Sequence, residues 1–163
     1  MQISDGQQMY GKVRIILKDK KGMVIEEREV RNTIVNKGRE LVANLLAGNT
    51  GAGIGAITYM GVGTGSTATT SNMEGLETAK LPRSAIEKKT VTMVGEEAQI
   101  DIEATFKGDD IVPEGETVVS LRESGIFTAQ SEGIMYNRII FDEIPLRKSL
   151  ELTLQWKLCF PAA

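Results

Sequence analysis

The segment with the clearest potential for chemistry is rich in glycine and reads Gly61-Val62-Gly63-Thr64-Gly65-Ser66-Thr67. Glycine-rich turns that follow a strand can cradle phosphates, because their backbone approaches the anion closely. A nucleotide-binding P-loop also requires a Lys-Ser/Thr pair that opens a helix, whereas this segment continues as Ala68-Thr69-Thr70-Ser71. A dinucleotide-binding turn requires a third glycine at a fixed offset and a helix N-terminus. The pattern therefore favours a tight structural turn, where backbones approach closely, over a phosphate site.

Two groups of carboxylates are further candidates. Asp101 and Glu103 fall on one face of an alternating stretch, where paired carboxylates can serve general acid/base catalysis. The solvated face of an antiparallel sheet explains the same spacing better. An acidic segment, Asp109-Asp110 with Glu114 and Glu116, offers oxygen ligands suited to calcium but lacks the regular spacing of an EF-hand. We therefore predict neither a metal site nor catalytic carboxylates.

The chain contains no histidine and one cysteine, Cys159. The commonest acid/base group and metal ligand is therefore missing, and neither a Cys/His zinc site nor an internal disulfide can form. Ser124 has no histidine to activate it as a nucleophile. Cys159 is expected to be a small packing residue at a subunit contact. The prediction is a protein that is not an enzyme, with no catalytic residues, no metal and no cofactor.

The composition is that of one ordinary globular domain. The 163 residues are 41% hydrophobic and 25% charged, which permits a sizeable core and argues against disorder of the whole chain. The formal net charge is −3 and the densest basic group is Lys18, Lys20 and Lys21, so neither nucleic acid nor a membrane surface is an expected partner. Residues 1–8 lack the apolar core of a signal peptide, and no stretch approaches the roughly 20 apolar residues that cross a bilayer. Synthesis in the cytoplasm is the expectation.

The elements that would position these residues begin with a hairpin. Residues 1–8 are interpreted as a flexible arm, and residues 9–163 as a single domain. In its N-terminal part, residues 9–31, strands over Tyr10–Leu17 and Met23–Val30 flank a turn that ends at a glycine. The many charges of the second strand predict that this hairpin is largely solvated.

One helix is predicted, over residues 36–47. Asn36 is a favoured N-cap residue, and Gly48 supplies the C-terminal stop. A helix of three turns is not stable alone, so it must dock an apolar stripe on a sheet. That stripe recurs at helical spacing and consists of Leu41, Val42, Leu45 and Leu46.

The rest of the chain is predicted to be almost entirely strands. Apolar residues alternate most clearly over Leu150–Phe160, which should form a central core strand with Trp156 inside. Polar loops are expected over Gly61–Gly75 and Gly108–Gly115. Seven or eight strands separated by turns predict a mainly β fold: an antiparallel, jelly-roll-like β-sandwich with one short α-helix and an N-terminal β-hairpin. The other strands are expected at Ile57–Val62, Ser84–Val94, Ala98–Phe106, Thr117–Thr128 (with a bulge at Glu123-Ser124-Gly125) and Ile134–Phe141.

The order of short motifs along residues 24–160 resembles that of small virion proteins of tailed bacteriophages. Those proteins often carry a V-x-N-x-G helix start, an A/G-V-G-T-G-x-T-A loop, an E-x-G-I/L-F strand and a final T-x-x-W strand. The resemblance depends on the order in which these motifs follow one another, and no single motif carries it. The corresponding stretches here are Asn32–Glu40, Ile57–Ala68, Glu123–Phe127, Met135–Phe141 and Leu152–Leu158.

The resemblance implies a structural role in the virion without catalysis. Its leading form is a capsid decoration or cement protein, which would stabilise the particle by contacting the major capsid protein and other copies of itself, as a trimer or dimer. The protein would be made in the host cytoplasm and reside in the virion. The alternatives are a tail fibre or baseplate appendage, and a receptor- or carbohydrate-binding module that uses the loops Gly61–Gly75 and Gly108–Gly115. An enzyme is the least expected class.

Overall fold

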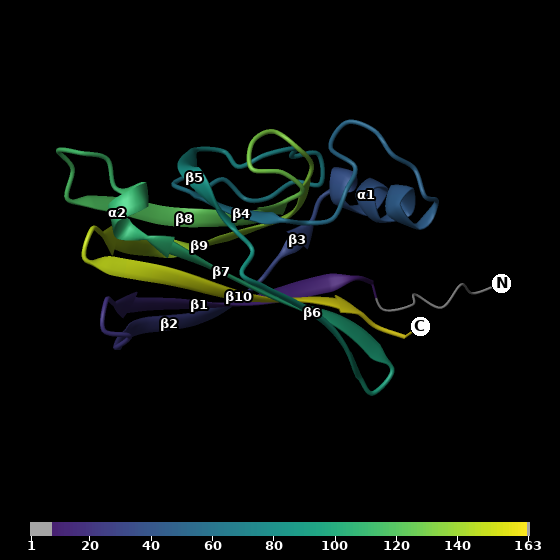
Figure 1. Cartoon of the computed structure of the whole chain (residues 1–163), viewed down its shortest axis with the longest axis horizontal. Helices are drawn as coiled ribbons and strands as arrows, with labels where there is room; N and C mark the ends of the chain where they lie inside the picture. The colour runs from purple at the N-terminus through teal and green to yellow at the C-terminus, as the bar shows by residue number, and fades with distance from the viewer. Residues whose placement is uncertain (1–7, 163) are drawn as a thin grey trace.

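Alternating apolar and polar side chains sort the chain into two antiparallel sheets of five strands each, packed face to face (Figure 1). The computed structural model describes residues 8–162, so the predicted arm lies outside the described residues except for Gln8. The predicted β-sandwich is confirmed. Sheet A has the order β2 (Val24–Arg31), β1 (Tyr10–Asp19), β10 (Leu150–Phe160), β7 (Glu97–Lys107) and β6 (Lys88–Val94). Sheet B has the order β3 (Thr33–Ile34), β9 (Met135–Arg147), β8 (Val118–Phe127), β4 (Tyr59–Gly63) and β5 (Ala79–Ala85).

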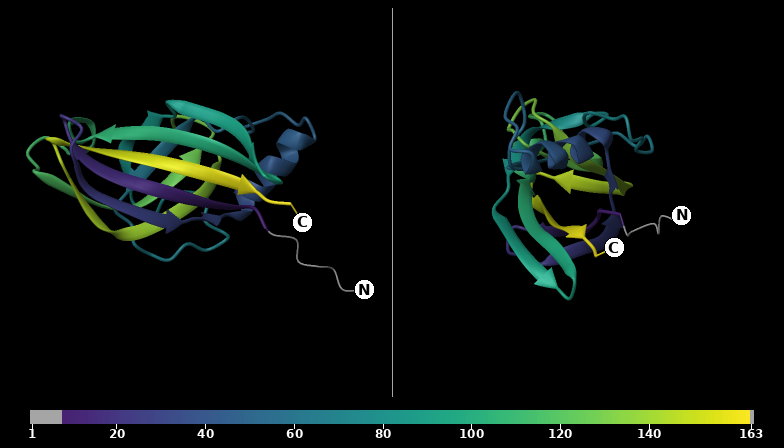
Figure 2. Two further views of the ribbon diagram at one scale, coloured as in Figure 1. Left: turned by 90° about the horizontal axis from the view of Figure 1, so that it is seen from below. Right: turned by 90° about the vertical axis from the view of Figure 1, so that its right-hand side faces the viewer.

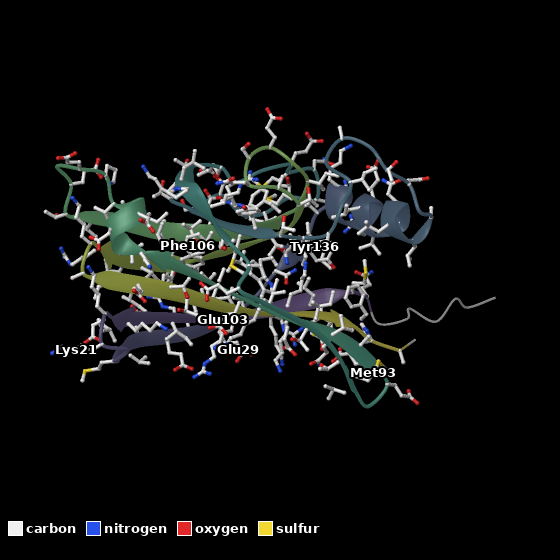
Figure 3. All side chains as sticks on the ribbon, viewed as in Figure 1. Lys21, Glu29, Met93, Glu103, Phe106 and Tyr136 are labelled. Atoms are coloured by element: carbon white, nitrogen blue, oxygen red, sulfur yellow. The ribbon has the colours of Figure 1, made fainter. Side chains whose placement is uncertain are left out.

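Strand β10 is the central strand of sheet A, as its alternation predicted. It pairs with β1 on one side and β7 on the other, which places Trp156 between Val13 and Ile102 on the inner face of the sheet. Trp156 is buried, and its indole Nε1 donates a hydrogen bond to Asn32 Oδ1 at 3.0 Å. Phe106, labelled in Figure 3, belongs to the same core between the sheets. The last strand in the chain therefore organises the sheet.

The N-terminal hairpin is more deeply integrated than its charges suggested. Alternate residues of β1, namely Val13, Ile15 and Leu17, are buried in the core, because β1 lies next to β10. Only β2 is largely solvated, and even there Arg28 reaches across to sheet B, where its guanidinium donates to the carbonyl oxygens of Asp142 and Glu143. The prediction of a largely solvated hairpin is thus wrong for β1.

The single strand predicted over Ser84–Val94 is in fact two strands in different sheets. β5 ends at Ala85 in sheet B, and β6 begins at Lys88 in sheet A. The two residues between them bond to both sheets: Ile86 N–H donates to the Thr58 carbonyl at 2.9 Å, and Glu87 N–H donates to the Glu103 carbonyl at 2.8 Å. Since the chain stays extended through this crossing, its local sequence pattern does not reveal the change of sheet.

Helix α1 (Asn36–Leu46) forms where predicted but begins and docks differently. Its N-cap is Val35 and makes no side-chain capping bond, so the assignment of Asn36 as the N-cap is wrong. The Asn36 side chain instead donates to Asn72 Oδ1 at 2.9 Å. Gly48 follows the helix with φ = 71°, the left-handed conformation that ends helices.

The apolar stripe of α1 is only half covered. Gly38 packs so closely on the Tyr136 carbonyl that a Cβ there would collide with it, and Leu41 is buried. Leu45 and Leu46 are 45% and 85% exposed, because the helix extends past the end of sheet B (Figure 1). The expectation that the whole stripe docks is therefore wrong.

A second helix, α2 (Gly108–Ile111), begins the segment predicted to be a polar loop. Its four residues bring Ile111 and the following Val112 into the core. Gly108 lies against the Arg147 carbonyl, where no Cβ would fit. The helix was not predicted, because the acidic pair Asp109-Asp110 indicated a fully exposed loop. Within residues 8–162, neither helix is long and apolar enough to cross a membrane.

Candidate functional site

The glycine-rich loop closes around a buried carboxylate. Glu123, from β8, is fully buried. Its Oε1 accepts hydrogen bonds from Gly65 N–H at 3.0 Å and Thr78 N–H at 2.7 Å, and its Oε2 accepts one from Glu77 N–H at 2.9 Å. Backbone N–H groups thus converge on an anion, as they do in phosphate-binding turns. Here the anion is the protein's own side chain, so the position that a phosphate would take is filled from inside.

Arg138, from the neighbouring strand β9, completes the cluster. Its Nε donates to Glu123 Oε2 at 2.9 Å, and both side chains are 0% exposed. Its Nη1 donates to the Thr67 carbonyl at 2.7 Å and to Thr69 Oγ1 at 2.8 Å. A buried charge is tolerated when it is paired and hydrogen-bonded in this way. The pair therefore fastens the loop, residues 64–78, to two central strands of sheet B.

The glycines of the loop are explained by this close approach. A Cβ on Gly63 would collide with Glu123 Oε1 and with the Thr78 carbonyl, and a Cβ on Gly65 would lie 2.8 Å from Glu123 Oε1. The geometry agrees with the interpretation of a turn in which backbones approach closely. From the sequence, Glu123 was expected only in a bulge and in a motif of the resemblance, and Arg138 only within such a motif. No local signal marked these two residues, because each strand carries other charges as well, such as Arg122 in β8 and Asp142 in β9.

Ser124 is also committed to the fold. Its side chain is buried on the opposite face of β8 from Glu123, and its Oγ donates to the Gly61 carbonyl at 2.7 Å. The hydroxyl thus supports the pairing of β4 with β8, in which Ser124 and Val62 are opposite each other.

Asp101 and Glu103 lie on the outer face of sheet A, where the alternation placed them. Asp101 is 4.0 Å from Lys157 Nζ, and Glu103 is 3.5 Å from Lys88 Nζ. They line a shallow groove of about 470 Å³ across the sheet, to which Glu29 contributes from β2. Glu29 and Glu103 are labelled in Figure 3. Asp101 and Glu103 each have a lysine neighbour, so the groove contains charges of both signs.

The acidic segment after β7 does not gather its carboxylates. Asp109 Oδ2 accepts from Lys20 Nζ at 2.7 Å, and this bond lowers the pKa of Asp109 below its ordinary value. In the part of the chain that the structure describes, no group of three or more His, Cys, Asp or Glu residues is placed to hold a metal ion.

Two further polar residues of β9 are enclosed in the core beside Arg138, whose Nη2 has no hydrogen-bond partner among the described residues. Neither amide atom of Asn137 nor the hydroxyl of Tyr136 has a hydrogen-bond partner among the described residues. Burial raises the pKa of Tyr136, labelled in Figure 3, to about 12. The phenol therefore stays protonated throughout the ordinary pH range and is not a base.

Cys159 is 1% exposed and lies opposite Tyr10 in the β1–β10 ladder. Burial raises the pKa of its thiol above the ordinary value, and the thiolate is the reactive form.

We expect a thiol reagent such as DTNB to label Cys159 in the native protein at pH 8 on the order of a hundredfold more slowly than in the unfolded protein. The absorbance of the released thiolate, followed with and without denaturant, measures both rates. Similar rates would show that the thiol is accessible.

Three of the stretches that carry the phage resemblance meet at one place in the fold. The glycine-rich loop, Glu123–Phe127 and Met135–Phe141 supply the glycines, the carboxylate and the guanidinium of the buried cluster. The three stretches therefore contribute to one cluster in the interior of this protein. Comparisons with protein-family models, with curated proteins and with solved structures gave no match.

Proposed function

We propose that this chain is a non-catalytic structural protein of a tailed-bacteriophage virion, and that it acts as a capsid decoration protein. The observation that carries the proposal is the convergence of the motif residues on the Glu123–Arg138 pair. The backbone N–H groups of the glycine-rich segment and its continuation bind Glu123, so these motifs serve to build a rigid body. Such a body suits a protein that works by contact with neighbouring chains.

Exposed apolar side chains supply surfaces for such contacts. Large exposed apolar residues that lie close together commonly mark protein–protein interaction sites. They occur here at the end of α1, near the β1–β2 turn, and from the middle of β6 to the β6–β7 turn. The residues are Leu45 and Leu46; Met23, Val24 and Ile25; and Val91, Met93 and Val94.

The glycine-rich loop is less suited to the receptor- or carbohydrate-binding role. Arg138 binds the carbonyl of Thr67 and the hydroxyl of Thr69, so part of the loop's hydrogen-bonding capacity is already used. A glycan array probed with the purified chain tests this alternative, and saturable binding to one glycan class would favour it over decoration.

A reconstitution experiment tests the proposal. The purified chain is added to heads of the phage that encodes it, prepared without the native copy, and bound protein is measured after the heads are pelleted. Saturable binding and greater resistance of the heads to heat are expected. The same assay with isolated tails is the internal comparison. Binding to tails alone would assign the chain to the tail or baseplate, and binding to neither would contradict a virion role.

A further inference from the structure

Strand β6 leaves a long edge of sheet A uncovered. It is the last strand in the sheet order, and all seven of its residues are exposed. Its Val91 and Met93 side chains are 70% and 64% exposed. The β6–β7 hairpin extends away from sheet B (Figure 2), and Met93 lies near its end (Figure 3). An uncovered edge strand presents unpaired N–H and C=O groups and is a template for another strand.

The other three edge strands of the described part of the chain carry features that discourage pairing. β3 has only two residues. β5 contains Pro82 and meets β4 through a register shift. β2 has charges at five of its eight positions and a register shift against β1. β6 has no proline, keeps a continuous register with β7, and is charged only at Lys88 and Lys89. Proteins use such features to block edges, so the exception at β6 suggests an edge that is used.

We propose that β6 pairs antiparallel with the β6 strand of a second copy of this chain, about a two-fold axis at Val91. The β6–β7 turn has two residues, Gly95-Glu96, between the paired Val94 and Glu97. Val94 therefore bonds to β7, and so does every second residue before it. The backbone N–H and C=O groups of the residues between them point to the open edge, and these residues are Lys89, Val91 and Met93. With the axis at Val91, Val91 of one copy lies opposite Val91 of the other, and Lys89 of one copy lies opposite Met93 of the other. Sheet A of each copy then continues into the other.

The sequence of β6 complements its own antiparallel copy. Thr90 and Thr92 flank Val91 symmetrically, so each threonine faces a threonine, which is a favourable cross-strand pair. On the other face, the exposed Val91 side chains of the two copies meet at the axis. Apolar surface that is in water in the single chain is thus covered in the pair.

The charges of the hairpin also select this arrangement. Lys88 and Lys89 begin β6, and Glu96 and Glu97 follow its end. Antiparallel pairing brings the basic end of each copy beside the acidic turn of the other, whereas parallel pairing would bring the four lysines together. Lys88 and Lys89 already contact Glu103 and the Ile57 carbonyl, at 3.5 and 2.9 Å, and both contacts lie within one chain, so pairing can preserve them. The edge therefore fits a second copy.

Sedimentation velocity of the full chain over a concentration series tests this pairing, which does not depend on the proposed virion role. The contact is small, so a weak monomer–dimer equilibrium is expected. Val91→Lys sets like charges opposite each other at the axis and is expected to weaken the dimer at least about tenfold. Ile25→Lys, on the exposed part of the β2 edge, is the matched control and should dimerise like the wild-type chain. Circular dichroism checks that both variants are folded.

A cysteine variant tests the position of the axis. Val91→Cys should form a disulfide-linked dimer on mild oxidation, since residues opposite each other in antiparallel strands lie within disulfide range. Ile25→Cys should not cross-link efficiently, and the native Cys159 is buried. A wild-type chain that stays monomeric at its highest soluble concentration would overturn the proposal. So would a dimer or trimer that Val91→Lys leaves intact, or a Val91→Cys chain that cross-links no better than its control.

Discussion

Replacing Arg138 by methionine is expected to lower the free energy of unfolding by about 3–5 kcal/mol. The substitution keeps much of the side-chain volume but leaves the Glu123 carboxylate buried and without its cation. It also removes the donors to Thr67 and Thr69, so the loop loses its fastening to β9. Chemical denaturation, followed by the fluorescence of Trp156, measures the change. A loss below about 1 kcal/mol would show that the pair contributes little.

Arg122→Met is the matched control for this experiment. Arg122 lies in the adjacent strand β8 and pairs with Glu143 at 3.3 Å, but the two side chains are 34% and 49% exposed. An exposed pair of this kind contributes about 1 kcal/mol or less. Arg138→Lys is a second comparison, because lysine keeps the charge but cannot reproduce the bonds of both Nε and Nη1. It should fall between the wild-type chain and Arg138→Met.

Replacing Gly63 by alanine is expected to cost at least about 2 kcal/mol. The new Cβ would collide with the Thr78 carbonyl and Glu123 Oε1, so either the β4–β5 pairing or the buried cluster must shift. A backbone atom cannot move aside cheaply, which is why one methyl group has so large an effect here. Thermal unfolding of the variant measures the loss.

Gly75→Ala is the control for this substitution within the same part of the chain. A Cβ on Gly75 would meet nothing within 4 Å. The change should alter the free energy of unfolding by no more than about 0.5 kcal/mol. Equal effects of the two alanines would mean that loop flexibility, rather than the close approach to Glu123, explains the glycines.

The fold was predictable where one strand carries a complete pattern. The alternation in Leu150–Phe160 identified a central strand with the bounds that β10 has in the structure. The pattern of Ala98–Phe106 likewise gave the inner face of β7 and the outer position of Asp101 and Glu103. A strand with one buried face has apolar residues at alternate positions, so its own sequence is sufficient to predict which face is buried.

Features that depend on distant residues were not predictable in the same way. The change of sheet after Ala85 is an example, since both strands are extended and only their partners differ. The half-docked stripe of α1 is another, because the extent of sheet B beneath Leu45 and Leu46 is set elsewhere in the chain. The cluster at Glu123 joins groups from β8, β9 and the loop 64–78, and the sequence contains no local record of that meeting.

The place of β10 in sheet A has a consequence for biosynthesis. Among the described residues, the β1–β2 and β6–β7 hairpins are connected in sheet A only through β10, which is synthesised after all the other described strands. Until it emerges, the apolar faces of β1 and β7 have no common neighbour, and the two hairpins remain separate units. Closure of sheet A therefore waits for the synthesis of β10, and a nascent chain stalled before Leu150 would expose apolar strand faces that chaperones bind.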